Sequence, residues 1–272
     1  MTARPAGEAF DALADELRRL PARLRTSVLG RTLHVLARAA STNDVARALA
    51  EEGAPDGTTV IALQQTAGRG RRGRSWISPR GGLYLSVVLY PRLAPAQWPL
   101  ISLAAAVGVA EGIAAAGGPA VALKWPNDVM LAGRKAGGIL LETGARASGV
   151  RFAILGVGVN AAGGQGHVAR LPDEAAVVDL PLSVLAKAVL ENLEMALVAL
   201  AADPAAIRDR WRAYSETLGR RVQVIPAVGG PTAGALAGAF EGVAEDVDAQ
   251  GALLVRTADG LRRVLAGDVT LR

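Results

Sequence analysis

The segment Gly68 to Trp76 constrains the fold more than any other part of this 272-residue chain. It reads Gly-Arg-Gly-Arg-Arg-Gly-Arg-Ser-Trp, and its first six residues match the G-x-G-x-x-G pattern of dinucleotide-binding folds. That pattern requires a helix to begin at once, so that its amides meet a pyrophosphate. Ser75-Trp76-Ile77-Ser78-Pro79 follows instead and starts no helix cleanly. The sequence therefore argues against a doubly wound dinucleotide-binding fold and predicts a loop.

This loop carries a high density of positive charge. Arg69, Arg71, Arg72 and Arg74 place four guanidinium groups on a glycine-rich segment. Guanidinium groups form paired hydrogen bonds to phosphate and carboxylate oxygens, so the loop is suited to close over an anion such as a nucleoside triphosphate. A solvated basic loop is the alternative interpretation of these residues taken alone.

Lysine is scarce, and its positions are informative. Only Lys124, Lys135 and Lys187 occur among 30 basic residues. Two of the three lie close together, in Lys-Trp-Pro-Asn-Asp and in Arg-Lys-Ala-Gly-Gly. This placement suggests that a compact ammonium group, and not a planar guanidinium fork, is needed there.

Composition excludes several kinds of site. The chain has no cysteine, which rules out disulfides, thiolate metal sites and cysteine nucleophiles. His34 and His167 are too far apart and too poorly accompanied to predict a metal site. The net charge of +5 is modest and aromatic residues make up only 4%, which weighs against nucleic-acid binding through stacked bases.

The sequence shows no targeting or membrane-spanning signal. Its first residues lack the apolar run of a signal peptide. The longest apolar stretch, 100–116, is interrupted by Ser102, Gly108 and Glu111, so we expect a buried, alanine-rich helix shorter than a membrane span. A cytoplasmic location is expected.

The order of the expected elements indicates an α+β fold, a β-sheet with helices mainly on one side. Helices are expected at 8–20, after Ser41-Thr42-Asn43-Asp44, and at 100–116, 181–201 and 204–218. Strands are expected at 60–64, 83–89, 121–125 and 151–159, with a hairpin of 129–131 and 138–142 about Gly133.

The sequence changes character near Leu218. Short strand-like runs at 221–225, 237–243, 253–256 and 262–265 are joined by Gly, Pro and Asp turns, as in a small β-barrel. The stretch 229–238 is predicted to be a mobile loop. The expected organisation is an N-terminal helical extension (1–30), a main domain (31–217) and a small barrel (218–272).

Five signatures occur in order along the chain. They are Ser41-Thr42-Asn43, Gln64-Gln65 leading into 68–76, Lys124-Trp125-Pro126-Asn127-Asp128, Lys135-Ala136-Gly137-Gly138-Ile139-Leu140-Leu141-Glu142, and Gly156-Val157-Gly158-Val159-Asn160. With these signatures the chain, from about Ser41 onward, resembles the biotin protein ligases of the bacterial type. Each signature alone is weak, but a chance match to all five in order is very improbable.

The resemblance implies a fold, a reaction and partners. The implied fold is α+β: a mixed β-sheet catalytic domain of the biotin/lipoate ligase type with helices mainly on one side, here 31–217, followed by a small C-terminal SH3-like β-barrel, here 218–272. The reaction converts biotin and MgATP to biotinyl-5'-AMP and pyrophosphate, and then attaches biotin to a lysine of a biotin carboxyl carrier domain. ATP, Mg²⁺ and biotin are thus required without a tightly bound prosthetic group, and monomer and homodimer both remain open.

The resemblance also assigns roles to individual residues. A carboxylate attacking an α-phosphate needs charge neutralisation and positioning, which would fall to Lys124, Arg69 and Arg71. Biotin binding is expected at Ser41, Thr42, Asn43, Gln65, Arg69, Gly70, Arg71, Lys124 and Gly138. ATP binding is expected at Arg71, Arg72, Arg74, Trp76, Lys124, Asn127, Lys135 and Asn160. Asp128 and Glu142 are candidate Mg²⁺ contacts, although no ligand set stands out.

Other interpretations remain open. Ser41-Thr42-Asn43 also suits an ordinary helix cap, Asn127 a turn, and Trp125 is first interpreted as a core aromatic. The alternative functions are a lipoate ligase of the same fold, although lipoate ligases lack the Arg/Gly loop, and a basic nucleic-acid-binding module. Because a single helix is predicted before Ser41, no DNA-binding winged helix-turn-helix is expected.

Overall fold

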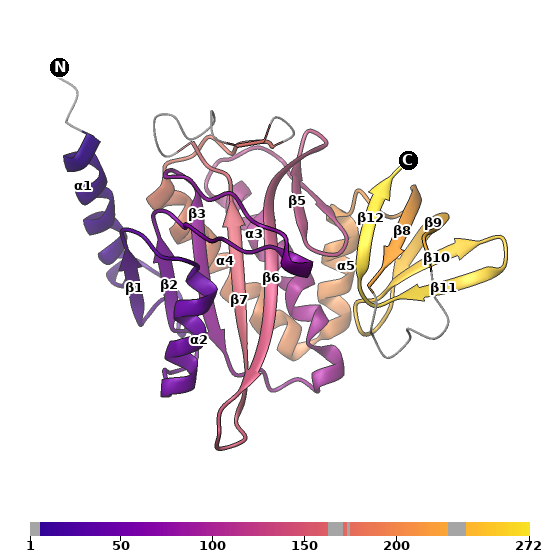
Figure 1. Cartoon of the computed structure of the whole chain (residues 1–272), viewed down its shortest axis with the longest axis horizontal. Helices are drawn as coiled ribbons and strands as arrows, with labels where there is room; N and C mark the ends of the chain where they lie inside the picture. Colours follow the sequence, from indigo (N-terminus) through magenta and orange to yellow (C-terminus); the bar gives the residue numbers. More distant parts are fainter. Residues whose placement is uncertain (1–5, 163–170, 173–174, 228–237) are drawn as a thin grey trace.

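The computed structural model describes residues 6–162, 171–172, 175–227 and 238–272 (Figure 1). Its largest element is a seven-stranded sheet in the order β1-β2-β3-β7-β6-β5-β4. β1 and β2 run parallel, and the other neighbouring strands are antiparallel. The strands are β1 (Leu33–Leu36), β2 (Thr59–Ala62), β3 (Leu83–Leu89), β4 (Ala122–Lys124), β5 (Asp128–Leu131), β6 (Arg134–Ala145) and β7 (Arg151–Val159). β3 is buried along its whole length, which explains why it is almost continuously apolar.

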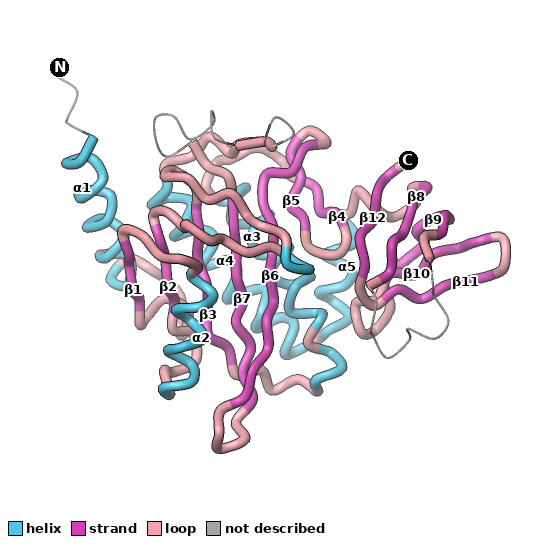
Figure 2. Tube along the Cα trace, viewed as in Figure 1, coloured by secondary structure: helices cyan, strands magenta, loops and turns pink. Residues whose placement is uncertain are grey.

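Three helices cover one face of this sheet (Figure 2). They are α3 (Pro99–Ala115), α4 (Leu182–Ala202) and α5 (Pro204–Tyr214). Two glycines let α3 and α4 approach closely: a Cβ on Gly108 would lie 2.7 Å from the Cα of Leu193, and one on Gly112 would lie 2.8 Å from the Cα of Val189. Because only glycine tolerates backbone at that distance, these two positions set the packing of α3 on α4.

α2 (Thr42–Glu52) packs on the opposite face of the sheet. Its Ala46 and Ala50 form a separate apolar cluster with Val60, Phe152 and Ile154. α1 (Ala6–Arg18) lies beside β1 at the edge of the sheet and is followed by a 3-10 turn, Leu20–Ala22. The arrangement brings the N-terminal end of α2 next to the central strands.

A second, five-stranded antiparallel sheet follows α5, in the order β11-β10-β9-β8-β12. Its strands are β8 (Arg221–Pro226), β9 (Phe240–Val247), β10 (Leu253–Thr257), β11 (Gly260–Val264) and β12 (Gly267–Leu271). Trp125 joins the two sheets, because its indole Nε1 donates to the carbonyl of Gly251 at 3.0 Å. The smaller sheet therefore lies against the β4 end of the larger one (Figure 1).

Most predicted elements are present, and three differ. The predicted strands 83–89 and 151–159 coincide with β3 and β7. β1 and β12 were not predicted: each is a short run, and β1 shows no contrast between two faces. The predicted helix 204–218 was too long: α5 ends at Tyr214, since the Ser215 hydroxyl accepts hydrogen bonds from the next turn and residue 215 pairs with Leu123. His167 and most of 229–238 lie outside the described residues.

One helical stretch of the described chain, Pro95–Ala115, is long and apolar enough to cross a membrane by length and composition. The prediction that no run reaches that length was therefore wrong, since Glu111 is its one charged residue. The prediction of a buried helix is confirmed, because 72% of the most apolar part of this stretch is buried inside the structure. Arg210 compensates the charge of Glu111, with Nε 3.2 Å from Oε1.

Candidate active site

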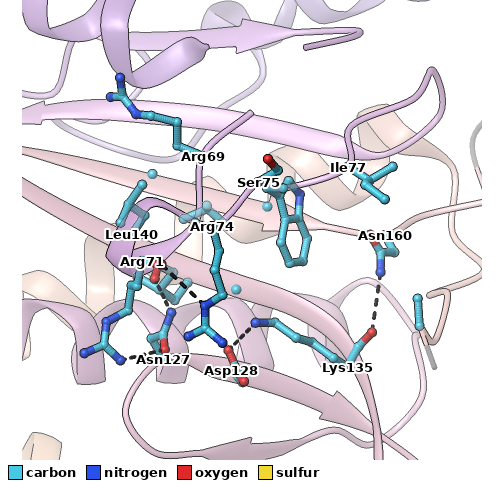
Figure 3. A pocket seen from close by; sticks show the side chains of 18 of the residues that line it. Arg69, Arg71, Arg74, Ser75, Ile77, Asn127, Asp128, Lys135, Leu140 and Asn160 are labelled. Carbon is cyan, nitrogen blue, oxygen red and sulfur yellow. Dashed lines mark hydrogen bonds and ion pairs between the residues drawn. The ribbon is translucent and has the colours of Figure 1, made fainter. Parts of the chain in front are cut away.

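A cavity of about 470 Å³ opens where the arginine-rich loop, the larger sheet and β12 meet (Figure 3). Its wall combines the start of α2, the loop 65–77, the β4–β5 turn, β6, β7 and residues 268–270. The predicted site residues that line it are Ser41, Thr42, Asn43, Gln65, Arg69, Gly70, Arg71, Arg74, Trp76, Lys124, Asn127, Lys135, Gly138 and Asn160. Of the residues predicted to bind biotin or ATP, Arg72 alone is not part of this lining.

Buried polar side chains form a hydrogen-bonded network at one end of the cavity. Gln65 Oε1 accepts from the backbone N–H of Thr42 at 2.8 Å and from its hydroxyl at 3.1 Å. The hydroxyl of Ser86, on β3, lies 2.7 Å from Thr42 Oγ1 and 2.6 Å from Asn43 Oδ1. Gln65 Nε2 donates to Ser78 Oγ at 2.9 Å. The network fixes which donors and acceptors this end presents.

Ser41 does not act as a side-chain cap. It occupies the N-cap position of α2 in an extended conformation, but its hydroxyl makes no capping hydrogen bond. The residue is buried and lines the cavity. The capping interpretation is therefore wrong for the Ser41 side chain.

Glycines on β6 and β7 make room for the cavity. A Cβ on Gly156 would lie 2.4 Å from Asn43 Oδ1, and one on Gly158 would lie 2.7 Å from Trp76 Nε1. Gly138 pairs with Gly158 across the two strands. A larger residue at 156 or 158 would push on side chains that line the cavity, which gives the Gly-Val-Gly signature a steric reason.

Two carboxylates hold Arg69. Its guanidinium contacts Asp44 and lies 2.7 Å from Glu142 Oε2, which also accepts from Asn43 Nδ2 at 2.8 Å. Burial lowers the pKa of Arg69, but the two carboxylates outweigh burial and hold that pKa above its usual value. Arg69 thus ties the loop to α2 and β6, and in Figure 3 its guanidinium points away from Arg71.

Arg71 is half-buried in the wall of the cavity. Its NH1 donates to Asn127 Oδ1 at 3.2 Å, and Asn127 Nδ2 donates to the carbonyl of Ile139 at 2.6 Å (Figure 3). Burial lowers the pKa of Arg71, while the negative charges of Asp268 and Asp128 oppose that shift. A guanidinium stays protonated nonetheless. Asn127 is therefore more than a turn residue, because it orients a partly desolvated cation.

Arg72 and Arg74 share one carboxylate. Arg72 NH1 lies 2.8 Å from Asp268 Oδ2, and Arg74 NH2 lies 2.5 Å from Asp268 Oδ1. Asp268 belongs to β12, 194 residues after Arg74. Three of the four loop arginines are thus paired with carboxylates, so mutual repulsion does not govern the loop.

The strand that carries Lys124 is clamped by the segment that follows α5. The carbonyl of Leu123 accepts from the backbone N–H of Glu216 at 3.0 Å, and the backbone N–H of Trp125 donates to Thr217 Oγ1 at 2.9 Å. Trp125 is only 1% exposed, which confirms its interpretation as a core aromatic. These bonds hold Lys124, the last residue of β4, at the cavity wall.

Another part of the cavity wall combines an aromatic ring with an ion pair. Lys135 Nζ lies 2.5 Å from Asp128 Oδ1 and 5.3 Å from the centroid of the Trp76 ring. Trp76 Nε1 and Asn160 Oδ1 are buried and have no hydrogen-bond partner in the described part of the chain. Asn160 Nδ2 donates to the carbonyl of Ala176 at 3.1 Å, which fixes its amide.

Asp128 and Glu142 do not fit a resident magnesium site. Asp128 is paired with Lys135, and Glu142 is paired with Arg69 and Asn43. The described residues contain no group of three or more His, Cys, Asp or Glu side chains that could hold a metal ion. The two predicted Mg²⁺ contacts are thus already engaged by cations and an amide.

Comparison with known proteins assigns the chain to a family. Residues 35–160 match the "Biotin/lipoate A/B protein ligase family", and residues 217–272 match the "Biotin protein ligase C terminal domain". The "Biotin--[acetyl-CoA-carboxylase] ligase" of Paracoccus denitrificans is 36% identical over 258 residues, covering 86% of this chain and 98% of that relative. The chain belongs to the biotin protein ligase family.

Further biotin protein ligases support this assignment. The "Biotin--[acetyl-CoA-carboxylase] ligase" of Mycobacterium tuberculosis is 36% identical over 268 residues, covering 90% of this chain and 93% of that relative. The structure of the biotin protein ligase from Aquifex aeolicus in complex with biotin and ATP has a TM-score of 0.71 and 25% identity, covering 89% of this chain and 99% of that one. The predicted resemblance, enzyme class and fold class, including the small C-terminal SH3-like domain, are confirmed.

Sequence reasoning missed two residues of this biotin protein ligase site. Ser86 lies behind the cavity, and its signal was present: a serine inside the apolar run 83–89 needs a buried hydrogen-bond partner. Asp268 lies in the cavity wall. No local pattern marks it, because its strand was not recognised and its partners are nearly 200 residues away.

Proposed function

We propose that this biotin protein ligase activates biotin with MgATP and transfers it to a lysine of a biotin carboxyl carrier domain, a part of a biotin-dependent carboxylase. In the first step a biotin carboxylate oxygen attacks the α-phosphorus of ATP and pyrophosphate leaves. In the second, the lysine amine attacks the acyl carbon of biotinyl-5'-AMP, AMP leaves, and the amine loses a proton.

One observation carries this proposal: a single cavity joins a neutral, hydrogen-bonding end to a cationic end. Thr42, Asn43 and Gln65 line the first, and Arg71, Arg74 and Lys124 line the second. A ureido group requires fixed donors and acceptors, whereas a carboxylate meeting a triphosphate requires positive charge. The relative from Aquifex aeolicus, which holds biotin and ATP together, supports the same pair of ligands.

The biotin end is expected to match both parts of that molecule. Ser41, with Thr42, Asn43 and Gln65, would hold the ureido ring through the network described above. Leu140, which pairs with Gly156 and so shares the cavity face of the sheet, lines the cavity and would contact the hydrocarbon tail. Gly138 and Gly70 would leave space for the backbone to approach the ligand closely.

Lys124 is proposed to hold the two reacting anions together. A compact ammonium group can lie between a carboxylate oxygen and an α-phosphate oxygen, which reduces their repulsion as the new bond forms. Arg71 is already oriented by Asn127 and partly desolvated, so its charge acts strongly on the same centre. Arg69 is held by two carboxylates, so we propose that it positions the loop over biotin and does not neutralise charge at the reacting centre.

The nucleotide is proposed to occupy the remaining part of the cavity. Trp76 and Asn160, which both line the cavity, would contact the adenine base, Trp76 through its ring face. Arg74 and Lys135 would approach the phosphates. Magnesium is proposed to arrive as MgATP, since the described side chains do not form a resident site.

Pyrophosphate release and retention of biotinyl-5'-AMP by the purified protein, given biotin and ATP, test the proposal. Lys124→Ala should slow release by at least about a hundredfold, as expected for loss of one preorganised charge at the reacting centre. Lys187→Ala is the matched control, because Lys187 is paired with Glu191 on α4. Wild-type protein that releases no pyrophosphate would refute the function, and a normal rate for Lys124→Ala would refute the role of Lys124. Biotinylation of a carrier domain, read as a mass increase, tests the second step.

A further inference from the structure

We infer that Asp268 acts as an internal substitute for nucleotide phosphate, holding the arginine-rich loop against the C-terminal sheet until the phosphates of ATP displace it. The inference rests on the proposed function, because it takes ATP as the ligand at the cationic end of the cavity. It assigns Asp268 an inhibitory role, since ATP must break existing ion pairs before it can use Arg74.

The geometry at Asp268 resembles the binding of a phosphate group. One carboxylate offers one oxygen to Arg72 at 2.8 Å and the other to Arg74 at 2.5 Å. Phosphate oxygens receive guanidinium groups in the same way. Asp268, Val269 and Thr270 lie in the cavity wall together with Arg71 and Arg74. The carboxylate is therefore at the place where an anionic ligand would meet the loop.

The charge balance of this wall makes Asp268 an obstacle to a triphosphate. Among the cations in the wall, Arg69 is held by Asp44 and Glu142, Lys135 is paired with Asp128, and Arg74 is paired with Asp268. Asp268 neutralises Arg74, and its charge also reaches Arg71, whose pKa it raises against the effect of burial. An incoming triphosphate would meet a like charge there. Either the Asp268 side chain turns away or β12 moves.

The loop backbone provides a second, independent indication. Arg72 has φ +58°, in the left-handed region that a residue with a Cβ adopts at a cost, and Gly73 follows with φ +74°. This conformation directs Arg72 to Asp268 and away from the cavity lining. A strained loop persists only when other contacts hold it. Breaking the Asp268 pairs would therefore release Arg72, which could then turn toward the phosphates.

Asp268→Asn and Asp268→Ala, made in the full chain, separate this role from that of an ordinary structural ion pair. ATP binding is measured by calorimetry without biotin, so that no reaction occurs. If Asp268 competes with phosphate, both variants should bind ATP about three- to tenfold more tightly, as expected from the loss of partly exposed ion pairs. Amide exchange at residues 69–75 should also be faster in the ligand-free variants. Asp259→Asn is the matched control, because Asp259, in the turn between β10 and β11, pairs with Arg262 of the same sheet.

Two results would overturn the inference. Unchanged or weaker ATP binding by folded Asp268 variants would show that the carboxylate is neutral or supports the site. Unchanged exchange at 69–75 would show that it does not hold the loop. If neither variant gives a cooperative melt, exchange in the wild-type protein at low and high salt replaces them, because salt screens partly exposed pairs; salt-independent protection then refutes the inference. Wild-type protein that binds no ATP refutes the proposed function instead, while the ligand-free exchange comparison still tests the ion pairs.

Discussion

Ser86→Ala tests whether the network behind the cavity sets the affinity for biotin. Ser86 is fully buried on β3, and its hydroxyl lies 2.7 Å from Thr42 Oγ1 and 2.6 Å from Asn43 Oδ1. A hydroxyl has one proton, and Thr42 can give its own to Gln65, so Ser86 is the donor available to Asn43 Oδ1. The substitution therefore leaves the Asn43 oxygen buried without that donor.

The expected magnitude follows from this lost partner. Leaving a buried acceptor unsatisfied costs about 1–3 kcal/mol, which should appear as a lower free energy of unfolding. Asn43 also lines the cavity and contacts Glu142, so a reoriented amide would change the groups offered to biotin. If the changed amide weakens the free energy of biotin binding by about 1.4 kcal/mol, the Kd for biotin rises about tenfold.

Urea denaturation and titration calorimetry with biotin measure the two effects. Ser183→Ala is the matched control, because Ser183 is also a buried serine and bonds to Glu16 at 2.8 Å on the far side of the fold. It should lose stability without losing biotin affinity. Normal biotin affinity in Ser86→Ala, with stability reduced in both variants, would refute the reasoning, because the network would then be purely structural.

Three further outcomes are expected. Gly158→Ala should raise the KM for ATP several-fold and spare biotin affinity, because its Cβ would lie 2.7 Å from Trp76 Nε1; equal effects on both ligands in pyrophosphate-release kinetics would contradict this. Lys124→Arg should release pyrophosphate nearly as slowly as Lys124→Ala, because a planar fork does not replace a point charge, and a near-normal rate would show that any cation suffices. Burial raises the pKa of Glu216, and Lys124 opposes that shift. The raised pKa therefore contributes stability below the unfolded pKa of about 4.3, and this contribution is lost as pH rises through the folded pKa. Glu216→Gln should therefore exceed the wild type in stability at pH 7 and equal it below about pH 4, and urea denaturation showing a pH-independent difference would count against this.

Much of the larger sheet could be predicted from the sequence, because burial leaves a local pattern. The apolar runs 83–89 and 151–159 coincide with β3 and β7, which are buried in the middle of the sheet. β1 was missed, since its four residues are all half-buried and show no contrast between two faces. The end of α5 was misplaced, because a tertiary pairing of residue 215 with Leu123 terminates it, and local propensity does not report such a pairing.

The predicted site residues could be found for a similar reason. Loops and strand ends that meet a ligand need particular residue types at adjacent positions. Short sequence motifs therefore mark them, such as the arginine-rich loop and Lys124-Trp125-Pro126-Asn127-Asp128. Gly156 and Gly158 also belong to such a motif, because a Cβ at these positions would meet the side chains of Asn43 and Trp76. The sequence by itself therefore determined the family and the fold class, and nearly all of the residues that it predicted for biotin and ATP line the cavity.

The tertiary structure decided how the charges in that cavity are paired. Sequence reasoning placed Arg72 on a phosphate, whereas the structure pairs it with Asp268 and leaves it outside the lining. Asp128 and Glu142, candidates for Mg²⁺, are held by Lys135 and Arg69. Coulomb interactions depend on the distance between the charges in space and not on their separation along the chain. Which carboxylate meets which guanidinium is therefore set only when β12 and the loop are brought together by packing of the two sheets.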